Sequence, residues 1–459
     1  MNVVTIGELM LRLTPPRHER FVQAESFEAV YGGGEANTAV SLSCLGDQAV
    51  FVTKLPAHAV GQAAVDALRR YGVDTRHIVR GGERIGIYFM ERGADRRPSD
   101  IIYDRAHSAF AESSEEEYDW PAIFAHADWL HLTGITPALG KNAAAIALRA
   151  IHEAKKRDLP VSFDVNYRAK LWSEEEARPV LTSFAALSDV IITNVTQAKE
   201  LFLLEGGDDE ALAAAVREKY GCKKVAFTFR RTLNAERNVI SAALFDGEAL
   251  FRAPEYEMHM IDRIGGGDAF SAGLIHALGK GMKAEEAVCF AEAASCLKHS
   301  VEGDMNLVTE GEVVPVKCED GDVQVKGTDL LKLAVVERHF ATGNIGKALL
   351  KGYGFHGGAL AVSMAHDSHN LVILGDDNAA MARAVEVMLE IGGGLVLISD
   401  EGEDSFPFDI AGLMSSAPCG EVVARTGEIA ERARKMGVKD CYDPVLTLVF
   451  MSLLVIPKL

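Results

Sequence analysis

The sequence predicts an α/β protein: a mostly parallel sheet flanked by helices, with a small β lid and a second, smaller α/β domain. Three observations carry this prediction. Short apolar runs alternate with longer segments of helical periodicity, which is the pattern of strands joined by crossover helices. Two adjacent apolar runs break that rhythm and predict a hairpin. A segment with Pro315 and several turn residues separates two stretches of the rhythm, so we expect domains at 1–312 and 329–459 joined by a linker at 313–328.

The elements of the first part follow one another regularly along the chain. Helices are expected at 35–45, 61–71, 141–157 and 198–204, since apolar residues recur there at helical spacing, and Gly46 and Gly72 follow two of them as stop signals. The intervening apolar runs predict strands, at 3–6, 50–53, 129–132, 161–164, 190–193 and 225–229. In a parallel sheet of this kind, ligands bind outside the carboxyl ends of the strands.

Three other regions complete the expected architecture. Residues 84–105 predict an antiparallel hairpin with a polar turn, which inside an α/β protein suits a lid, and the acidic stretch 112–119 predicts a solvated loop. After the linker the α/β pattern resumes. Strands are expected at 359–364, 371–374 and 395–399, and helices at 378–391 and 421–436.

Composition excludes several classes of function. The 459 residues carry 47 Lys and Arg against 66 Asp and Glu, a formal charge of −19, which argues against nucleic acid or an anionic membrane as the main partner. The seven cysteines include no C-x-x-C pair, which favours a reducing compartment. No basic region precedes the first strand, and the apolar run 445–456 is too short to span a bilayer. We therefore expect a cytoplasmic protein.

The strongest local motif is a run of three glycines, Gly265, Gly266 and Gly267, followed by Asp268 and a predicted helix. Backbone N–H groups at such a helix start can bind an anion. A carboxylate beside them would repel a phosphate, but it suits a general base that takes a proton from an attacking hydroxyl. The residues alone leave a second interpretation open, a glycine-rich turn in which Asp268 is the helix N-cap.

This motif and its helix resemble the signature of the ribokinase-like carbohydrate kinases, and 31–37 (Tyr-Gly-Gly-Gly-Glu-Ala-Asn) resembles their sugar-binding glycine motif. Within that family the resemblance is to the 2-keto-3-deoxygluconate kinases, and it covers roughly residues 1–312. It is carried by the segments 86–89, 102–105, 129–136, 163–172 and 298–304. It implies transfer of the γ-phosphate of ATP, with Mg²⁺, to the terminal hydroxyl of 2-keto-3-deoxygluconate. Asp268 would be the base, and the three glycines would stabilise the transferring phosphoryl group.

The resemblance also assigns substrate contacts. A sugar acid needs a cation in its pocket, and a guanidinium pairs with a carboxylate in fork geometry. The positions implied for the acid and keto end are Arg105, Arg168, Tyr88 and Tyr103, and those implied for sugar hydroxyls are Gly33 and Asn37. The alternatives are an exposed lid charge for Arg105, a structural ion pair for Arg168, and a place in the hairpin core for the two tyrosines.

On the nucleotide side, Thr228 and Arg230 follow a predicted strand and resemble the ATP-contacting segment of the family. Arg230 could equally be a surface arginine. Asn194 begins what is an N-x-x-E motif in the family, but this sequence has Gln197 in place of the glutamate. A neutral amide holds the waters of Mg²⁺ less tightly, so slower turnover or an altered metal dependence is expected. No side chain is predicted to bind a metal directly.

Residues 329–459 resemble the C-terminal domain of bacterial adenine deaminases, which usually continues a little further, so we expect the chain to be truncated there. The matching segments are 336–339, 342–346, 365–370, 391–395 and 410–414. His366, Asp367 and His369 suggest a metal cluster or, alternatively, a hydrogen-bonded loop. The metal-binding barrel of the deaminases has no counterpart upstream, so deaminase activity is not expected. This part could serve oligomerisation or purine binding, or be inert.

Three rival functions remain open. One is a kinase for fructose or ribose, which the two arginines disfavour. Another is a kinase for 2-keto-3-deoxygalactonate, which differs from the gluconate in one stereocentre. The third is a non-catalytic sugar- or purine-binding regulatory protein, which Gln197 favours and Asp268 disfavours. The expected partners are a small sugar acid and ATP, with neither nucleic acid nor membrane, and a homo-oligomer stays open.

Overall fold

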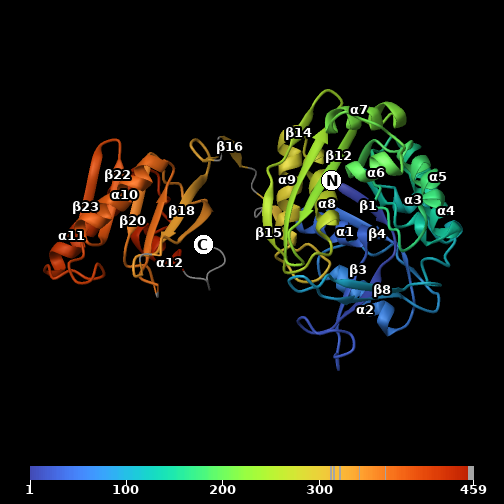
Figure 1. Ribbon diagram of the computed structural model, residues 1–459, viewed down its shortest axis with the longest axis horizontal. Coiled ribbons are helices and arrows are strands. Elements are labelled where there is room, and N and C mark those ends of the chain that lie inside the picture. Colours follow the sequence, from blue (N-terminus) through green and yellow to red (C-terminus); the bar gives the residue numbers. More distant parts are fainter. Residues whose placement is uncertain (311–312, 314–315, 320–321, 341, 367, 453–459) are drawn as a thin grey trace. The chain divides into compact units, whose positions relative to one another are not determined.

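The computed structural model describes residues 1–310, 313, 316–319, 322–340, 342–366 and 368–452. The chain forms two compact units, 1–315 and 316–459 (Figure 1). Each unit has its own sheet and its own buried cores.

A nine-stranded sheet forms the centre of the first unit. Its parallel part contains every strand that the apolar runs predict: β1 (Asn2–Ile6), β4 (Gln48–Val52), β9 (Trp129–Thr133), β10 (Val161–Asp164), β11 (Val190–Thr193) and β12 (Lys224–Thr232). An antiparallel extension at one edge was not predicted; it consists of β13 (Arg237–Phe245), β14 (Leu250–Arg252) and β15 (Tyr256–His259). The parallel strands are buried on both faces, which is why they read as continuous apolar runs.

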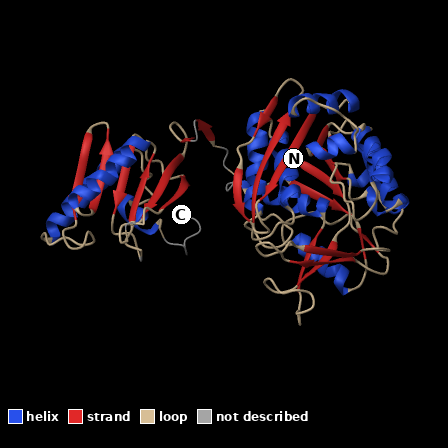
Figure 2. Cartoon of the chain, viewed as in Figure 1, coloured by secondary structure: helices blue, strands red, loops and turns tan. Residues whose placement is uncertain are grey.

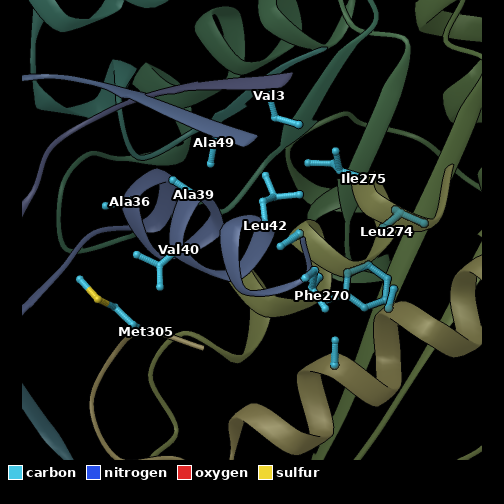
Figure 3. Packing of buried hydrophobic residues seen from close by; sticks show 14 of the residues in the cluster. Val3, Ala36, Ala39, Val40, Leu42, Ala49, Phe270, Leu274, Ile275 and Met305 are labelled. Atoms are coloured by element: carbon cyan, nitrogen blue, oxygen red, sulfur yellow. The ribbon is translucent and has the colours of Figure 1, made fainter. Parts of the chain in front are cut away.

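Helices cover both faces of this sheet (Figure 2). One face packs against α1 (Gly34–Cys44), α8 (Gly266–Gly279) and α9 (Ala284–Lys298), and Figure 3 shows Val3 of β1 among Leu42, Phe270 and Ile275 of this core. The opposite face forms a second core with α4 (Lys141–Lys155), α5 (Glu174–Ala185) and α7 (Asp209–Tyr220). The remaining helices are α2 (Ala59–Arg69), the short α3 (Trp120–Ile123) and α6 (Val195–Glu200), with the 3₁₀ turns η1 (Glu115–Glu117) and η2 (Pro137–Leu139).

The helix expected at 198–204 lies three to four residues earlier, at α6. Asn194 is its N-cap, and the Asn194 side chain accepts a hydrogen bond from the Gln197 N–H. This cap fixes the start of the helix more strongly than the later apolar residues do. The acidic segment 112–119, expected as a loop, contains η1 instead, with Ser114 and Glu117 forming a capping box.

A separate four-stranded sheet forms the lid. Its order is β3 (Glu28–Gly32), β2 (Met10–Thr14), β7 (Gly86–Glu91) and β8 (Asp100–Asp104). The predicted hairpin is the antiparallel pair β7–β8. Strands β2 and β3 were not predicted, because the buried face of β2 carries Arg12 and Thr14 as well as Met10 and therefore gives no apolar alternation. A two-stranded ribbon, β5 (Lys54–Leu55) with β6 (Val79–Arg80), lies elsewhere in the unit.

The second unit is built on a six-stranded sheet in which every neighbouring pair is antiparallel. Its order is β19 (Ile345–Lys351), β18 (Leu330–Val336), β21 (Leu371–Gly375), β20 (Gly358–Val362), β22 (Gly394–Ser399) and β23 (Gly402–Pro407). Helix α10 (Asn378–Ile391) packs on one face, while α11 (Cys419–Lys435) and α12 (Pro444–Phe450) pack on the other. A short hairpin precedes the sheet, β16 (Lys317–Glu319) with β17 (Asp322–Gln324). The predicted strands and helices are present, but the apolar runs did not reveal that the strands are antiparallel.

Two further features bear on the composition arguments. Within the part of the chain that the structure describes, no helix is long and apolar enough to cross a membrane. No disulfide joins the cysteines whose side chains are described; the side chain of Cys318 lies outside them.

Candidate active site

A cavity of about 610 Å³ opens at the carboxyl ends of the parallel strands, between the sheet and the lid. Asp164 of β10, Thr193 of β11 and Thr228 of β12 line one side, and Tyr88 of β7 and Tyr103 of β8 line the other. The cavity gathers every residue that the sequence singles out for catalysis, substrate or nucleotide: Gly33, Asn37, Tyr88, Tyr103, Arg105, Arg168, Asn194, Thr228, Arg230, Gly265, Gly266, Gly267 and Asp268. Residues spread over more than 230 positions of the chain thus meet in one place.

The glycine run forms the N-terminus of α8, and steric constraints explain two of its residues. Gly265 has φ +82°, a left-handed conformation that favours glycine. A Cβ on Gly265 would overlap the main-chain oxygen of Asp304, and a Cβ on Gly266 would overlap the ring of His299. Helix α8 therefore begins with bare backbone at the cavity wall, where its first N–H groups can bind an anion.

Asp268 is in the first turn of α8 and does not cap the helix. The N-cap is Gly265, and no side chain caps that end. Instead, Asp268 Oδ2 accepts a hydrogen bond of 2.7 Å from Asn37 Nδ2, and Asn37 Oδ1 accepts one from the Gly33 N–H at 3.3 Å. Burial raises the pKa of Asp268 to about 6, with the hydrogen bond from Asn37 acting against the rise. A buried carboxylate with a pKa near neutrality fits a general base better than a cap.

Two further carboxyl groups, which sequence reasoning did not assign, line the same cavity as Asp268: the buried Glu35 and the partly buried Asp164. Burial raises the pKa of Asp164 to about 7, and the charge of Asp268 adds to that rise. Burial also raises the pKa of Glu35 to about 7, although the Thr133 and Thr136 hydroxyls donate to its carboxylate. Asp164 stands at the end of β10 inside one of the segments that carry the family resemblance, so its place in the sequence was the available signal.

The arginines of the cavity fall into two groups. Arg105 is only 9% exposed, and it donates through Nε and Nη2 to one carboxylate oxygen of Glu8. The interpretation of Arg105 as an exposed lid charge is therefore wrong. Arg168, Arg230 and Arg263 form no ion pair with any described residue.

These three arginines create a positive region in an otherwise acidic chain. Burial lowers the pKa of Arg230, and the nearby charges of Arg263 and Arg168 lower it further. The interpretation of Arg168 as a structural ion pair finds no partner among the described residues. Sequence reasoning assigned no role to Arg263, although it lies only two residues before Gly265. Such a cluster suits a ligand with several negative charges.

The lid tyrosines differ in their surroundings. Tyr88 is 3% exposed and packs with Met10 and Met90, and its hydroxyl donates a hydrogen bond to the carboxylate of Asp304. Its ring centroid lies 6.0 Å from that of Tyr103. The Arg105 guanidinium lies over the Tyr103 ring at 5.4 Å, so the ion pair with Glu8 and the tyrosine together hold this side of the lid.

On the nucleotide side, the Asn194 side-chain oxygen caps α6, which leaves the amide N–H groups of this cavity residue for a ligand. Gln197 Oε1 lies 3.2 Å from Thr193 Oγ1, which donates to it. Thr228 and Arg230 occupy the cavity end of β12, where the parallel and antiparallel parts of the sheet meet.

The histidine pair of the second unit gives a different picture. The His366 ring stacks on Phe450 with a centroid distance of 5.1 Å, and His369 has a left-handed backbone with φ +50°. Asp367 lies outside the described residues. Among the described residues of both units, which include His366 and His369, no group of three or more His, Cys, Asp or Glu side chains is arranged to hold a metal ion.

Comparison with known proteins assigns the two parts of the chain. Residues 306–459 match the adenine deaminase C-terminal domain. Adenine deaminase 2 of Desulfotalea psychrophila is 47% identical over 158 residues, which are 33% of this chain and 27% of that protein. The chain therefore spans about a quarter of the length of that relative.

The first part has relatives that it matches along nearly their whole length. A 2-dehydro-3-deoxygalactonokinase of Haloferax volcanii is 32% identical over 68% of this chain and 95% of its own. The crystal structure of 2-dehydro-3-deoxygluconokinase from Thermotoga maritima is 44% identical with a TM-score of 0.67, covering 68% of this chain and 97% of that one. Residues 1–310 match the pfkB family carbohydrate kinase model. Together with the ribokinase-like fold and a buried aspartate at a glycine-rich helix start, these matches show that the chain belongs to the pfkB family of carbohydrate kinases, fused to an adenine deaminase C-terminal domain.

Proposed function

We propose that the first unit transfers the γ-phosphoryl group of Mg-ATP to the terminal hydroxyl of 2-keto-3-deoxygluconate (2-dehydro-3-deoxygluconate). The observation that carries the proposal is the position of Asp268, a buried carboxylate beside bare helix N–H groups in a cavity that also holds unpaired arginines. The Thermotoga maritima relative, which is named for this activity, supports the choice of substrate.

In this mechanism Asp268 accepts the proton of the sugar hydroxyl as that oxygen attacks the γ-phosphorus. Asn37 holds the carboxylate in place through its 2.7 Å hydrogen bond. The N–H groups of Gly265, Gly266 and Gly267 stabilise the negative charge on the transferring phosphoryl group, because they lie at the positive end of the α8 dipole.

The acid group of the sugar binds Arg168 in this proposal. Arg105 borders the same cavity, but its charge is already balanced by Glu8, so it contributes chiefly by supporting Tyr103 and the lid. Arg230 and Arg263 then remain for the phosphates of ATP, alongside Thr228 and Asn194. Gly33 and Asn37 would contact the sugar hydroxyls.

Mg²⁺ usually binds through one or two carboxylates, several waters and the phosphates of its nucleotide. Asp164 at the end of β10 suits that role, and Asn194 and Gln197 could hold waters of its coordination shell. Bound Mg²⁺ would shield the charge of the phosphates during transfer.

The test for this whole assignment is ADP release from Mg-ATP with 2-keto-3-deoxygluconate, fructose and ribose in parallel. Turnover with only the sugar acid supports it, and equal turnover with a neutral sugar contradicts it.

A second candidate substrate is 2-keto-3-deoxygalactonate, which the Haloferax volcanii relative favours by its name. The two acids differ at one stereocentre, so the same assay should include both at equal concentration. The ratio of their kcat/KM values decides between them.

The role of the second unit also remains a proposal. Because the chain spans only about a quarter of its adenine deaminase relative, we expect no deaminase activity and assign this unit to assembly or purine binding. Equilibrium sedimentation and calorimetric titration with adenine test these two roles.

A reducing, cytoplasmic location fits the cysteine content.

A further inference from the structure

A buried ionic bridge joins the lid sheet to the glycine loop. Arg12, on β2 of the lid, is 1% exposed. Its Nη1 donates to Asp304 Oδ1 and its Nη2 to Asp262 Oδ2, both at 2.7 Å, while its Nε donates to Thr14 Oγ1 at 2.8 Å. Although burial opposes the charged form, the two carboxylates keep the pKa of Arg12 above its ordinary value. The guanidinium therefore clamps two loops in a fixed fork.

At one end of the bridge, Asp262 organises the approach to the glycine motif. Its Oδ1 accepts from the Ile264 N–H at 3.0 Å, and its Oδ2 accepts from the Gly303 N–H at 3.1 Å. Gly265 follows directly after Ile264. A shift of the Asp262 carboxylate would therefore shift the start of α8 and the N–H groups that face the phosphoryl group.

At the other end, Asp304 touches both the lid and the loop. Its carboxylate accepts from the Tyr88 hydroxyl of β7, and it lies so close to Gly32 of β3 that a Cβ there would overlap it. Its main-chain oxygen packs against Gly265 in the same way. Asp304 therefore transmits a movement of the lid at Tyr88 directly to Gly265. Arg12 provides a second connection, through Asp262 and the Ile264 N–H.

Lys298 completes the charge balance of this network. It is fully buried and donates to the Val301 oxygen at 3.0 Å. Burial lowers its pKa, and the nearby charges of Asp262 and Asp304 oppose this only in part. Two cations thus face two carboxylates. Apolar residues can often replace buried ion pairs without loss of stability. They could not, however, fix the separation of two carboxylate-bearing loops as a planar fork does.

We propose that Arg12 is a positioning residue for phosphoryl transfer, which couples the lid that covers the sugar to the loop that holds the phosphoryl group. Occupation of the lid by the sugar acid then orders the N–H groups of Gly265 to Gly267. The inference rests on the proposed function for the identity of the sugar acid. It adds to that function a residue outside the substrate contacts, on which turnover depends.

The test compares Arg12→Lys with Arg84→Lys. Both change an arginine of the lid region, but Arg84 pairs only within the β7–β8 hairpin, with Asp104. Lysine keeps the charge of Arg12 and loses the fork. We expect R12K to lower kcat by about 10- to 100-fold, as misplacement of reacting groups by about 1 Å does. KM for the sugar acid should stay within a few-fold, and R84K should behave as wild type.

Hydrogen exchange gives a readout that a purely structural role would not change. In wild type, the sugar acid should slow exchange in residues 262–268, and in R12K this slowing should be lost while the lid peptide 86–104 is still protected. Equal slowing of the loop in both proteins would overturn the inference. A raised KM with unchanged kcat would also overturn it, because Arg12 would then serve binding alone.

Two further measurements keep the inference testable. If R12K does not fold, Tyr88→Phe removes only the lid end of the network, and the same loss of loop protection is expected; normal protection would contradict the coupling. If wild type phosphorylates no sugar acid, the proposed function fails by itself. The coupling is then judged without sugar: relative to R84K, R12K must speed hydrogen exchange in 262–268 and weaken binding of a non-hydrolysable ATP analogue.

Discussion

Asn37 Nδ2 donates a 2.7 Å hydrogen bond to Asp268 Oδ2, and so joins the first turn of α1 to the first turn of α8. Both helices begin in glycine-rich segments at the floor of the cavity. The bond orients the carboxylate and opposes the rise in its pKa that burial causes. The proposed base is thus held by a residue that was itself expected to contact the substrate.

Removing the charge of Asp268 tests its role directly. We expect Asp268→Asn to lower kcat by about 10²- to 10⁴-fold, the usual contribution of a general base, and to leave KM for the sugar acid nearly unchanged. Steady-state kinetics measures both. Asp66→Asn, at an exposed site on α2, is the matched control. Turnover of D268N close to that of D66N would contradict the assignment.

The pH profile should report the same carboxylate. Because the base must be deprotonated, kcat/KM should fall as pH drops below about 6, the pKa to which burial raises Asp268. The charge of Arg168 lowers that pKa, so Arg168→Ala should move the acid limb to higher pH, while Arg168→Lys should move it less. An acid limb at the same pH in wild type, R168A and R168K would show that Arg168 does not influence the pKa of Asp268. R168A should also raise KM more for the sugar acid than for a neutral sugar.

Arg105 should matter for stability. Arg105→Ala leaves the buried Glu8 carboxylate without its partner, which typically costs about 3–5 kcal/mol. Thermal unfolding should give a clearly lower Tm for R105A than for wild type. The double change Glu8→Met with Arg105→Met should restore much of it, since no buried charge is left unpaired. Arg84→Ala breaks an exposed pair, worth about 0–1 kcal/mol, and is the control. An R105A protein as stable as R84A would show that the pair contributes little.

Restoring a carboxylate at position 197 tests the departure from the N-x-x-E motif. Gln197→Glu has the same length and can still accept from Thr193. We expect a few-fold lower Mg²⁺ concentration at half-maximal rate, because a carboxylate holds the waters of Mg²⁺ more firmly. Lys199→Gln makes the same change of charge on the exposed side of α6 and should leave the Mg²⁺ dependence unaltered. An identical shift in both variants would indicate a general charge effect.

Glu292 predicts a pH-dependent stability unrelated to catalysis. It is buried in α9 with one carboxylate oxygen lacking a partner, and burial raises its pKa from 4.5 to about 8. The folded state therefore keeps the proton that the unfolded state loses, so wild type loses stability as pH rises from about 4.5 to 8. Glu292→Gln should raise Tm little near pH 5 and most at pH 8 and above. The exposed Glu285→Gln on the same helix should give no such trend.

The parallel strands and several helices of this chain were predictable because their side chains carry the signal locally. Helix α10 has the predicted ends, and strand β10 does too. The lid strand β2 was missed because Arg12 occupies its buried face and is neutralised by residues 250 and 292 positions away. The antiparallel direction of the second sheet was missed because apolar runs show burial and carry no direction.

The same contrast holds for the site. Family motifs located the glycine loop and Asp268 together with Arg105, Arg168 and Arg230, since these lie in segments that resemble the family, whereas Arg263 was missed. The pairing of Arg105 with Glu8 joins residues 97 positions apart, and no local pattern reveals it. We therefore propose that Arg105 supports the lid, beside the substrate contact that the family resemblance implies. Asp304 was likewise present in a matched segment, and only its contacts in three dimensions show what it does.

Asp304 also constrains how this protein can vary. Gly32 and Gly265 lie 233 positions apart, yet each would place a Cβ into the same aspartate. A substitution at either glycine would displace Asp304, so their effects should not add. Changes in the lid rim and in the phosphate loop therefore depend on one another: a variant that replaces Gly32 must also accommodate the displaced Asp304 at Gly265.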